Sequence, residues 1–96
     1  MGEAREMLHQ KTVDAICARA AKRLRTARIE RGLSMNNVAE KAGLSQQMVS
    51  YVERGICKPT LETLVRMGWA LELDIGKLIS DALNEMASRK SDFPKD

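Results

Sequence analysis

Apolar residues recur at steps of three and four along most of the chain, which is the pattern of amphipathic helices. The longest such stretch covers residues 12–30, where the opposite face is polar and basic and Gly32 follows as a stop signal. The pattern therefore predicts a first helix over residues 12–30, which residues 1–11 either extend or leave to fray. Its apolar positions are Val13, Ile16, Ala20, Leu24 and Ala27.

Two short helices are predicted next, over residues 34–42 and 45–54. Ser34 and Ser45 are residues of the kind that cap a helix, because the hydroxyl oxygen accepts a hydrogen bond from a backbone N–H of the first turn. Gly43, between them, can take the left-handed conformation that ends a helix. The connecting turn is too short for the two helices to lie side by side, which is the geometry of a helix-turn-helix.

Two further helices follow a turn at residues 56–59, with Thr60 and Asp74 as their predicted N-caps. The apolar positions of the fourth helix are Leu61, Leu64, Val65, Met67 and Leu71. Those of the fifth helix are Leu78, Ile79, Ala82, Leu83 and Met86. The tail from Ser88, which contains Lys, Asp and Pro, is predicted to be disordered.

The composition favours packed helices over a sheet. The chain has 96 residues, about the length of one domain. Aromatic residues make up only 3% of it, so the core must be built from Leu, Ile, Val, Met and Ala. We therefore expect a single all-α domain of five helices.

Basic residues are concentrated toward the start of the chain. Residues 1–31 hold eight basic and four acidic side chains, residues 32–58 hold three and two, and residues 59–96 hold five and seven. This asymmetry is typical of a protein that presents one end to an anion, and equally of an ordinary solvated helix face.

The sequence predicts no metal site, no cofactor and no enzyme. Cys17 and Cys57 lie forty residues apart without a CxxC motif, and His9 is the one histidine, so the spacing of metal ligands is absent. There is no Gly-rich phosphate loop, and His9 has no Ser or Cys partner for nucleophilic catalysis. Both cysteines are expected to be reduced thiols.

We expect a cytoplasmic protein without membrane contact. No apolar run reaches the roughly 18 residues of a membrane span. The opening residues, MGEAREML, are too acidic and too poor in apolar side chains for a secretory signal.

The two short helices lie in a run that resembles the repressor/Cro-type (XRE-like) helix-turn-helix family of bacterial and phage regulators, GLSMNNVAEKAGLSQQMVSYVERGICKPTLETL. The matching positions are Gly32-Leu33-Ser34, Val38-Ala39, Gly43, Ser45, Val49, Val52-Glu53, Gly55, Pro59, Leu61 and Leu64. The resemblance implies a compact lambda-repressor-like DNA-binding domain over residues 18–80. Residues 1–17 are then an N-terminal extension that continues into the first helix, and residues 81–96 are the end of the fifth helix and the tail.

The helix over residues 45–54 presents a polar face once Val49 and Val52 are turned to the core. The outward residues are Gln46, Gln47, Ser50, Tyr51 and Arg54. A glutamine amide offers a donor and an acceptor in one plane, which matches the N6/N7 edge of adenine in the major groove. An ordinary polar helix face has the same composition. The resemblance implies base contacts for Gln46, Gln47, Ser50 and Tyr51.

Phosphate contacts are expected around this reading helix. Asn36 and Asn37 open the second helix, where backbone N–H groups and the helix dipole favour an anion. The chain departs from the family at Met35, where Gln is frequent, and at Asn37, where Glu or Gln would complete a capping box. The full set of predicted phosphate contacts is Asn36, Asn37, Ser45, Lys58, Arg19, Arg23 and Arg54.

The resemblance also implies a buried salt bridge between Arg28 of the first helix and Glu53 of the third. The alternative is a pair of unconnected surface charges.

The expected function is that of a sequence-specific transcriptional regulator that binds double-stranded DNA. One reading helix contacts about 4–5 base pairs, which is too few for genomic specificity. A homodimer on a palindromic operator is therefore expected. Ile79, Leu83 and Met86 either form its self-complementary patch or close the monomer's own core.

The alternative function is that of an antitoxin or another interaction protein. Such a protein would bind a partner protein through residues 1–17 and would also bind its own promoter.

Overall fold

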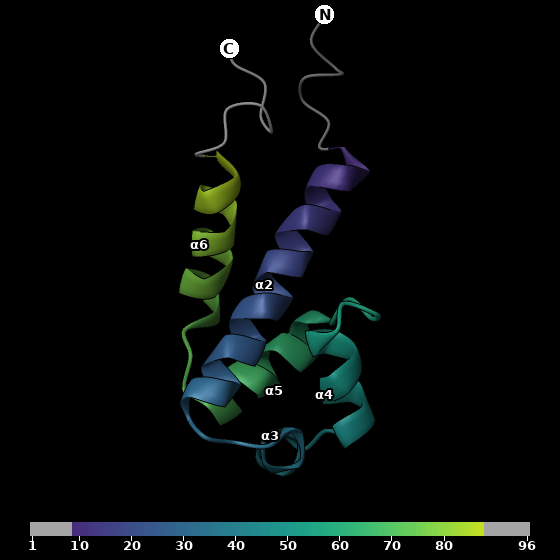
Figure 1. Ribbon diagram of the computed structural model, residues 1–96, viewed down its shortest axis with the longest axis vertical. Coiled ribbons are helices and arrows are strands. Elements are labelled where there is room, and N and C mark those ends of the chain that lie inside the picture. Colours follow the sequence, from purple (N-terminus) through teal and green to yellow (C-terminus); the bar gives the residue numbers. More distant parts are fainter. Residues whose placement is uncertain (1–8, 88–96) are drawn as a thin grey trace, which may run out of the picture.

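The computed structural model describes residues 9–87 and contains five α-helices in that part of the chain. They are α2 (Gln10–Glu30), α3 (Met35–Ala42), α4 (Gln46–Glu53), α5 (Leu61–Leu71) and α6 (Ile75–Ala87). The long helix α2 has α6 alongside it, and α3, α4 and α5 gather around its C-terminal end (Figure 1). No strand occurs within residues 9–87, and the predicted all-α fold of five helices is confirmed.

The helices begin and end close to the predicted positions. α2 starts at Gln10, two residues before the predicted start, so the helix continues into the N-terminal extension. The rest of that extension, residues 1–8, and the tail from Ser88 lie outside the described residues. Val13 and Ile16, which belong to the described part of the extension, are half-buried.

Side-chain oxygens at the helix starts explain why α3 to α6 begin where they do. Each oxygen accepts a hydrogen bond from the backbone N–H three residues later, at 3.0 or 3.1 Å. The residues are the four predicted N-caps, Ser34, Ser45, Thr60 and Asp74. Such a cap contributes about 1 kcal/mol to helix stability.

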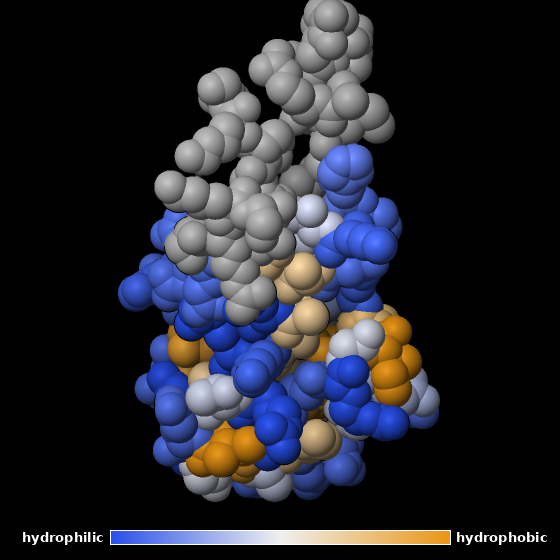
Figure 2. Space-filling model, turned by 45° about the horizontal axis from the view of Figure 1, so that its top comes forward, coloured by the Kyte–Doolittle hydropathy of each residue, from blue (hydrophilic) through white to orange (hydrophobic). Residues whose placement is uncertain are grey.

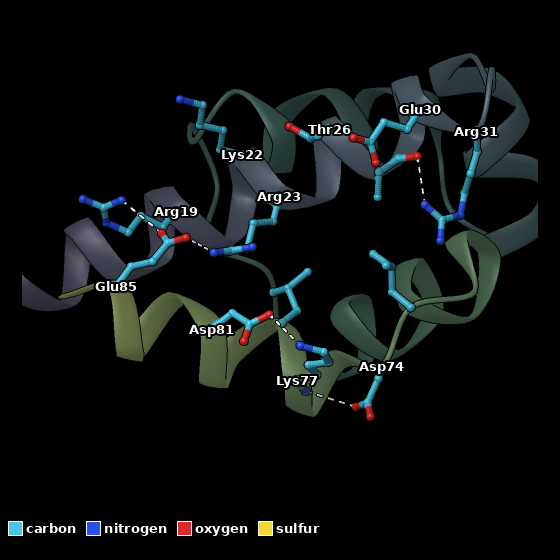
Figure 3. Close-up of a pocket in the computed structure, with 13 residues that line it drawn as sticks. Arg19, Lys22, Arg23, Thr26, Glu30, Arg31, Asp74, Lys77, Asp81 and Glu85 are labelled. Atoms are coloured by element: carbon cyan, nitrogen blue, oxygen red, sulfur yellow. Dashed lines mark hydrogen bonds and ion pairs between the residues drawn. The ribbon is translucent and has the colours of Figure 1, made fainter. Parts of the chain in front are cut away.

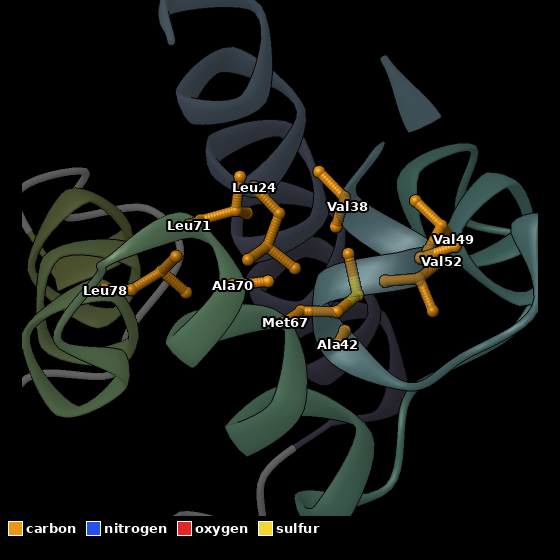
Figure 4. Close-up of a cluster of buried hydrophobic side chains, with 10 residues drawn as sticks. Leu24, Val38, Ala42, Val49, Val52, Met67, Ala70, Leu71 and Leu78 are labelled. Carbon is orange, nitrogen blue, oxygen red and sulfur yellow. The ribbon is translucent and has the colours of Figure 1, made fainter. Parts of the chain in front are cut away.

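The main core lies where α2, α3, α4 and α5 meet (Figure 4). Its largest fully buried side chains are Leu24, Val38, Val49, Val52, Met67 and Leu71. Removing such side chains from water contributes roughly 1.5–3 kcal/mol each. Because Val49 and Val52 both point into this core, the opposite face of α4 is held toward solvent.

Besides its contacts with α4 and α5, α2 packs against α6, which places Leu78 and Ala82 in the interior. α6 can start close to α5 because residue 68 is glycine. A Cβ on Gly68 would overlap the side chain of Ile75.

The apolar residues considered for a dimer patch on α6 are mostly used within the monomer. Met86 is buried, and Ile79 is partly buried against the core. Only Leu83 is exposed. Met86 and Ile79 therefore close the monomer's own core, which was one of the two expectations for them.

Candidate nucleic-acid interface

A tight turn connects α3 to α4. Gly43 has a φ of 70°, the left-handed conformation that a helix C-terminus favours and that glycine adopts without strain. The backbone N–H of Leu44 then donates to the carbonyl oxygen of Ala39 at 2.9 Å, which closes the end of α3. With Ser45 as the cap of α4, the two helices are set at an angle and α4 lies at the outer edge of the fold (Figure 1).

The outward face of α4 carries the residues predicted to read bases. Gln46 and Gln47 are exposed, whereas Ser50 and Tyr51 are half-buried. Nε2 of Gln47 donates a hydrogen bond to the hydroxyl of Tyr51 at 2.7 Å. This bond holds the Gln47 amide along the helix surface and uses one of its two N–H donors.

The N-terminus of α3 differs from the sequence expectation at Asn37. The side-chain oxygen of Asn37 accepts a hydrogen bond from the backbone N–H of Ser34 at 3.0 Å. The backbone N–H of Asn37 donates to the Ser34 hydroxyl, also at 3.0 Å. The expectation that Asn37 breaks the capping box is therefore wrong. The carboxamide oxygen supplies the same acceptor as Glu or Gln, on a side chain shorter by one methylene.

Asn36 is exposed beside this capping box, so both asparagines stand in the first turn of α3. The backbone N–H groups of a first turn and the helix dipole together favour an anion.

Further predicted phosphate contacts flank α4 at its two ends. The Ser45 hydroxyl already accepts from the backbone N–H of Met48, and Arg54 is exposed at the C-cap. Lys58 donates from Nζ to a carboxylate oxygen of Asp14 on α2 at 2.6 Å. This hydrogen bond raises the pKa of the Lys58 ammonium and lowers the pKa of the Asp14 carboxyl.

Arg28 and Glu53 form a bidentate ion pair between α2 and the last residue of α4. Nε and Nη2 of Arg28 lie 2.7 and 3.0 Å from the two carboxylate oxygens. The Glu53 side chain is 0% exposed and that of Arg28 is 12% exposed. Arg28 also donates from Nη1 to the carbonyl oxygen of Leu33 at 2.9 Å, so one guanidinium holds α2, α4 and the loop before α3.

Arg19 and Arg23 lie elsewhere, in a groove between α2 and α6 (Figure 3). Nη1 of Arg19 lies 3.1 Å from Glu85 on α6, and Arg23 pairs with the other oxygen of the same carboxylate. The structure therefore does not bring these two arginines together with Gln46 and Gln47.

Arg66 stabilises the C-terminal end of α3, next to the turn, and the sequence did not predict this role. From α5 it donates through Nη1 to the carbonyl oxygen of Ala42 at 3.2 Å, at the C-terminus of α3. Its Nε also pairs with Glu62 one turn earlier at 3.0 Å. A basic residue favours a helix C-terminus, but the sequence gives no sign that the cation comes from a different helix.

Within residues 9–87 no group of three or more His, Cys, Asp or Glu residues is arranged to hold a metal ion. The helices in this part of the chain are all too short or too polar to cross a membrane.

Solved structures of bacterial regulators have a similar fold. The clp gene regulator ClgR from C. glutamicum is 24% identical, with a TM-score of 0.66 over 74% of this chain and 92% of its own. Two tyrosine variants of the restriction-modification controller protein C.Esp1396I are 19% identical, with TM-scores of 0.67 and 0.68. Each covers 77% of this chain, and 94% and 96% of its own length. Among proteins of curated function, none matches the sequence.

The family model described as helix-turn-helix matches residues 24–78, which include all of α3, α4 and α5. The matched segment covers more than half of the chain, and it holds the tight turn at Gly43 and the polar face of α4. The protein therefore belongs to the XRE-type helix-turn-helix family of DNA-binding transcription regulators.

Proposed function

We propose that this protein reads a specific sequence of double-stranded DNA by placing α4 in the major groove. The observation that carries the proposal is the pair of exposed amides, Gln46 and Gln47, in the first turn of a helix whose other face is locked into the core. The N-terminal residues of a recognition helix enter the groove first. Each amide can make a bidentate contact with adenine, which discriminates against a wrong base by about 1–3 kcal/mol.

The surroundings of α4 support contacts to the DNA backbone on both sides of the groove. Asn36 and Asn37 offer amide donors at the N-terminus of α3, and Arg54 offers an exposed guanidinium at the end of α4. Such contacts fix the position of a protein on the duplex but carry no sequence information. We assign Ser45 and Lys58 to the same role. Arg19 and Arg23 are left out because they line the groove between α2 and α6 instead of the surface beside α4.

The proposed binding unit is a homodimer on a palindromic operator. A single helix of eight residues reaches too few base pairs to select one site in a genome. Two copies related by a two-fold axis would double the site, with half-sites about 34 Å apart.

The test is selection of bound sequences from a randomised duplex pool, followed by fluorescence anisotropy at several salt concentrations. The wild-type chain is expected to enrich a palindromic site. In the variant Gln46→Ala/Gln47→Ala we expect a loss of about tenfold to hundredfold in affinity for each glutamine. Its weak, salt-dependent attraction to any duplex should persist, because that attraction comes from phosphates.

The matched control is Asn84→Ala, which removes an exposed amide from α6 instead of α4. It should leave enrichment unchanged. Equal enrichment by the Gln46/Gln47 variant, or no enrichment by the wild type, would refute base reading by α4.

A further inference from the structure

A small apolar cavity lies where the middle of α2 meets α4, α5 and α6. The face of the molecule in Figure 2 is mostly hydrophilic, with only a few separate hydrophobic areas. The cavity differs from such areas because it is a hollow between helices, with a volume of about 180 Å³. Four helices and the loop after α4 contribute to its lining. Among the lining residues are Ile16, Leu24, Val52, Pro59, Leu64 and Ile79.

The cavity extends from the core to the surface. At its inner end, Leu24 and Val52 are 0% exposed. Leu64 and Ile79 on its walls are half-buried. At its outer end, the Lys58 side chain is 56% exposed. A molecule from solvent therefore enters beside Lys58 and reaches the side chains of the core.

The lining offers almost nothing that a water molecule can bind. Eight of the ten described residues that line the cavity have purely aliphatic side chains, and the other two are Cys17 and Lys58. A thiol is only a weak hydrogen-bonding group. Nζ of Lys58 is bound to Asp14 at 2.6 Å. Because a buried water molecule needs about two to four polar partners, an apolar molecule fills this cavity better than water does.

We propose that this cavity binds a small neutral ring compound. An apolar cavity of roughly 150 Å³ stays dry and holds benzene. The volume of about 180 Å³ therefore suits one six-membered ring with a short substituent. Drug-sized ligands occupy pockets of roughly 300–1,000 Å³, so they are too large for this one.

The ion pair at the entrance disfavours a charged ligand. An anion binds the Lys58 ammonium only by replacing Asp14, which already holds it. A charge that passes the ion pair loses its water among aliphatic side chains, and that loss is costly. A neutral ring meets neither obstacle, and it leaves the ion pair between Lys58 and Asp14 intact.

The cavity and the outward face of α4 lie on different sides of that helix. Val52 lines the cavity from the buried side of α4, whereas Gln46 and Gln47 are exposed. A ligand in the cavity therefore leaves these two amides free. The inference does not rest on the proposed function, since its test contains no DNA.

The experiment compares toluene with benzoate, which carries a carboxylate on the same ring in place of the methyl group. The measured quantities are the melting temperature and the rates at which iodoacetamide alkylates Cys17 and Cys57, followed by mass spectrometry. At ten times its dissociation constant, toluene is expected to raise the melting temperature by about 5 °C and to slow alkylation of Cys17 about tenfold. Cys57 does not line the cavity, so its rate should stay the same. Benzoate should change neither quantity.

A cavity-filling variant and a matched control test the location of the site. Ala20→Leu places a larger side chain in the cavity, so toluene should neither protect Cys17 nor raise the melting temperature. Ala18→Leu makes the same substitution at an exposed position of α2 outside the lining, and it should bind toluene as wild type does. Far-UV circular dichroism should show equal helix content in both variants. If Ala20→Leu does not fold, the protection of Cys17 in wild type decides.

Three results overturn the proposal. The first is that toluene, up to its solubility limit, changes neither the melting temperature nor the alkylation of Cys17. The second is that toluene slows both cysteines equally, and the third is that a folded Ala20→Leu variant keeps full protection. Equal protection by benzoate would refute the neutral class of ligand, because it would place the binding energy at the Lys58 ammonium.

Discussion

Two stretches of α2 use arginine in different ways. In its last turn, Arg28 binds Glu53 of α4, whose side chain is fully enclosed. Near the middle of the helix, Arg19 and Arg23 share Glu85 of α6, and all three side chains remain 27–41% exposed. An arginine–glutamate ion pair thus occurs in the interior of the helix-turn-helix, and partly exposed pairs of the same kind occur at the edge of the α2–α6 contact.

Burial decides what each ion pair is worth. An exposed pair gains little, because water and salt weaken the attraction between its charges. A buried pair gains little over an apolar pair of the same shape, but losing one member leaves an uncompensated charge in the interior. The helix-turn-helix therefore depends on Arg28 far more than the α2–α6 contact depends on Arg19 or Arg23.

The largest effect is expected from Arg28→Ala. It removes the partner of Glu53 and the donor to Leu33, so we expect the free energy of unfolding to fall by about 3–5 kcal/mol. Urea denaturation followed by circular dichroism measures this. Arg25→Ala, an exposed arginine on the same helix, should change stability by less than about 0.5 kcal/mol. Equal stability of the Arg28 and Arg25 variants would contradict the buried role of Arg28.

A double variant sharpens this test. Arg28→Met/Glu53→Leu removes both charges together, so it should recover much of the stability lost in Arg28→Ala. Failure to recover would mean that packing of the arginine side chain, rather than the unpaired carboxylate, causes the loss.

A smaller effect is expected from Ser34→Ala. It removes the acceptor for the Asn37 N–H and half of the capping box of α3, at a cost of about 0.5–2 kcal/mol. Hydrogen exchange in the first turn of α3 should be faster in this variant than in wild type, whereas exchange in α6 should be the same in both. Ser80→Ala, at an exposed position within α6, is the control. Unchanged exchange in α3 would show that the box contributes nothing to this end of the helix.

The smallest effect is expected from Glu85→Gln. It weakens the pairs with Arg19 and Arg23, and we expect a loss of at most about 1 kcal/mol at low salt. Thermal denaturation at two ionic strengths should show that the difference from wild type shrinks as salt is added. A loss above about 2 kcal/mol that salt leaves unchanged would remove the contrast between the Arg28 pair and the Arg19 and Arg23 pairs.

Much of the fold followed from local sequence signals. Ser34, Ser45 and Thr60 cap helices through atoms of their own first turns, and Val49 and Val52 are buried by their spacing alone. Short-range rules therefore predicted the starts of the helices that follow α2 and the outward face of α4.

The contacts that the sequence did not predict join residues far apart in the chain or depend on side-chain reach. Arg66 binds Ala42 across 24 positions, and Arg19 binds Glu85 across 66. The capping role of Asn37 depends on whether its short side chain can reach the backbone N–H of Ser34, which it does. The base and phosphate contacts remain predictions, because they concern DNA that only a binding experiment supplies.

Arg66 links α5 directly to the turn that orients α4. Its guanidinium binds the carbonyl oxygen of Ala42, the last residue of α3, next to the turn at Gly43. The position of α5 therefore affects the angle at which α4 is held, and anything that steadies the turn steadies α5 by the same free energy.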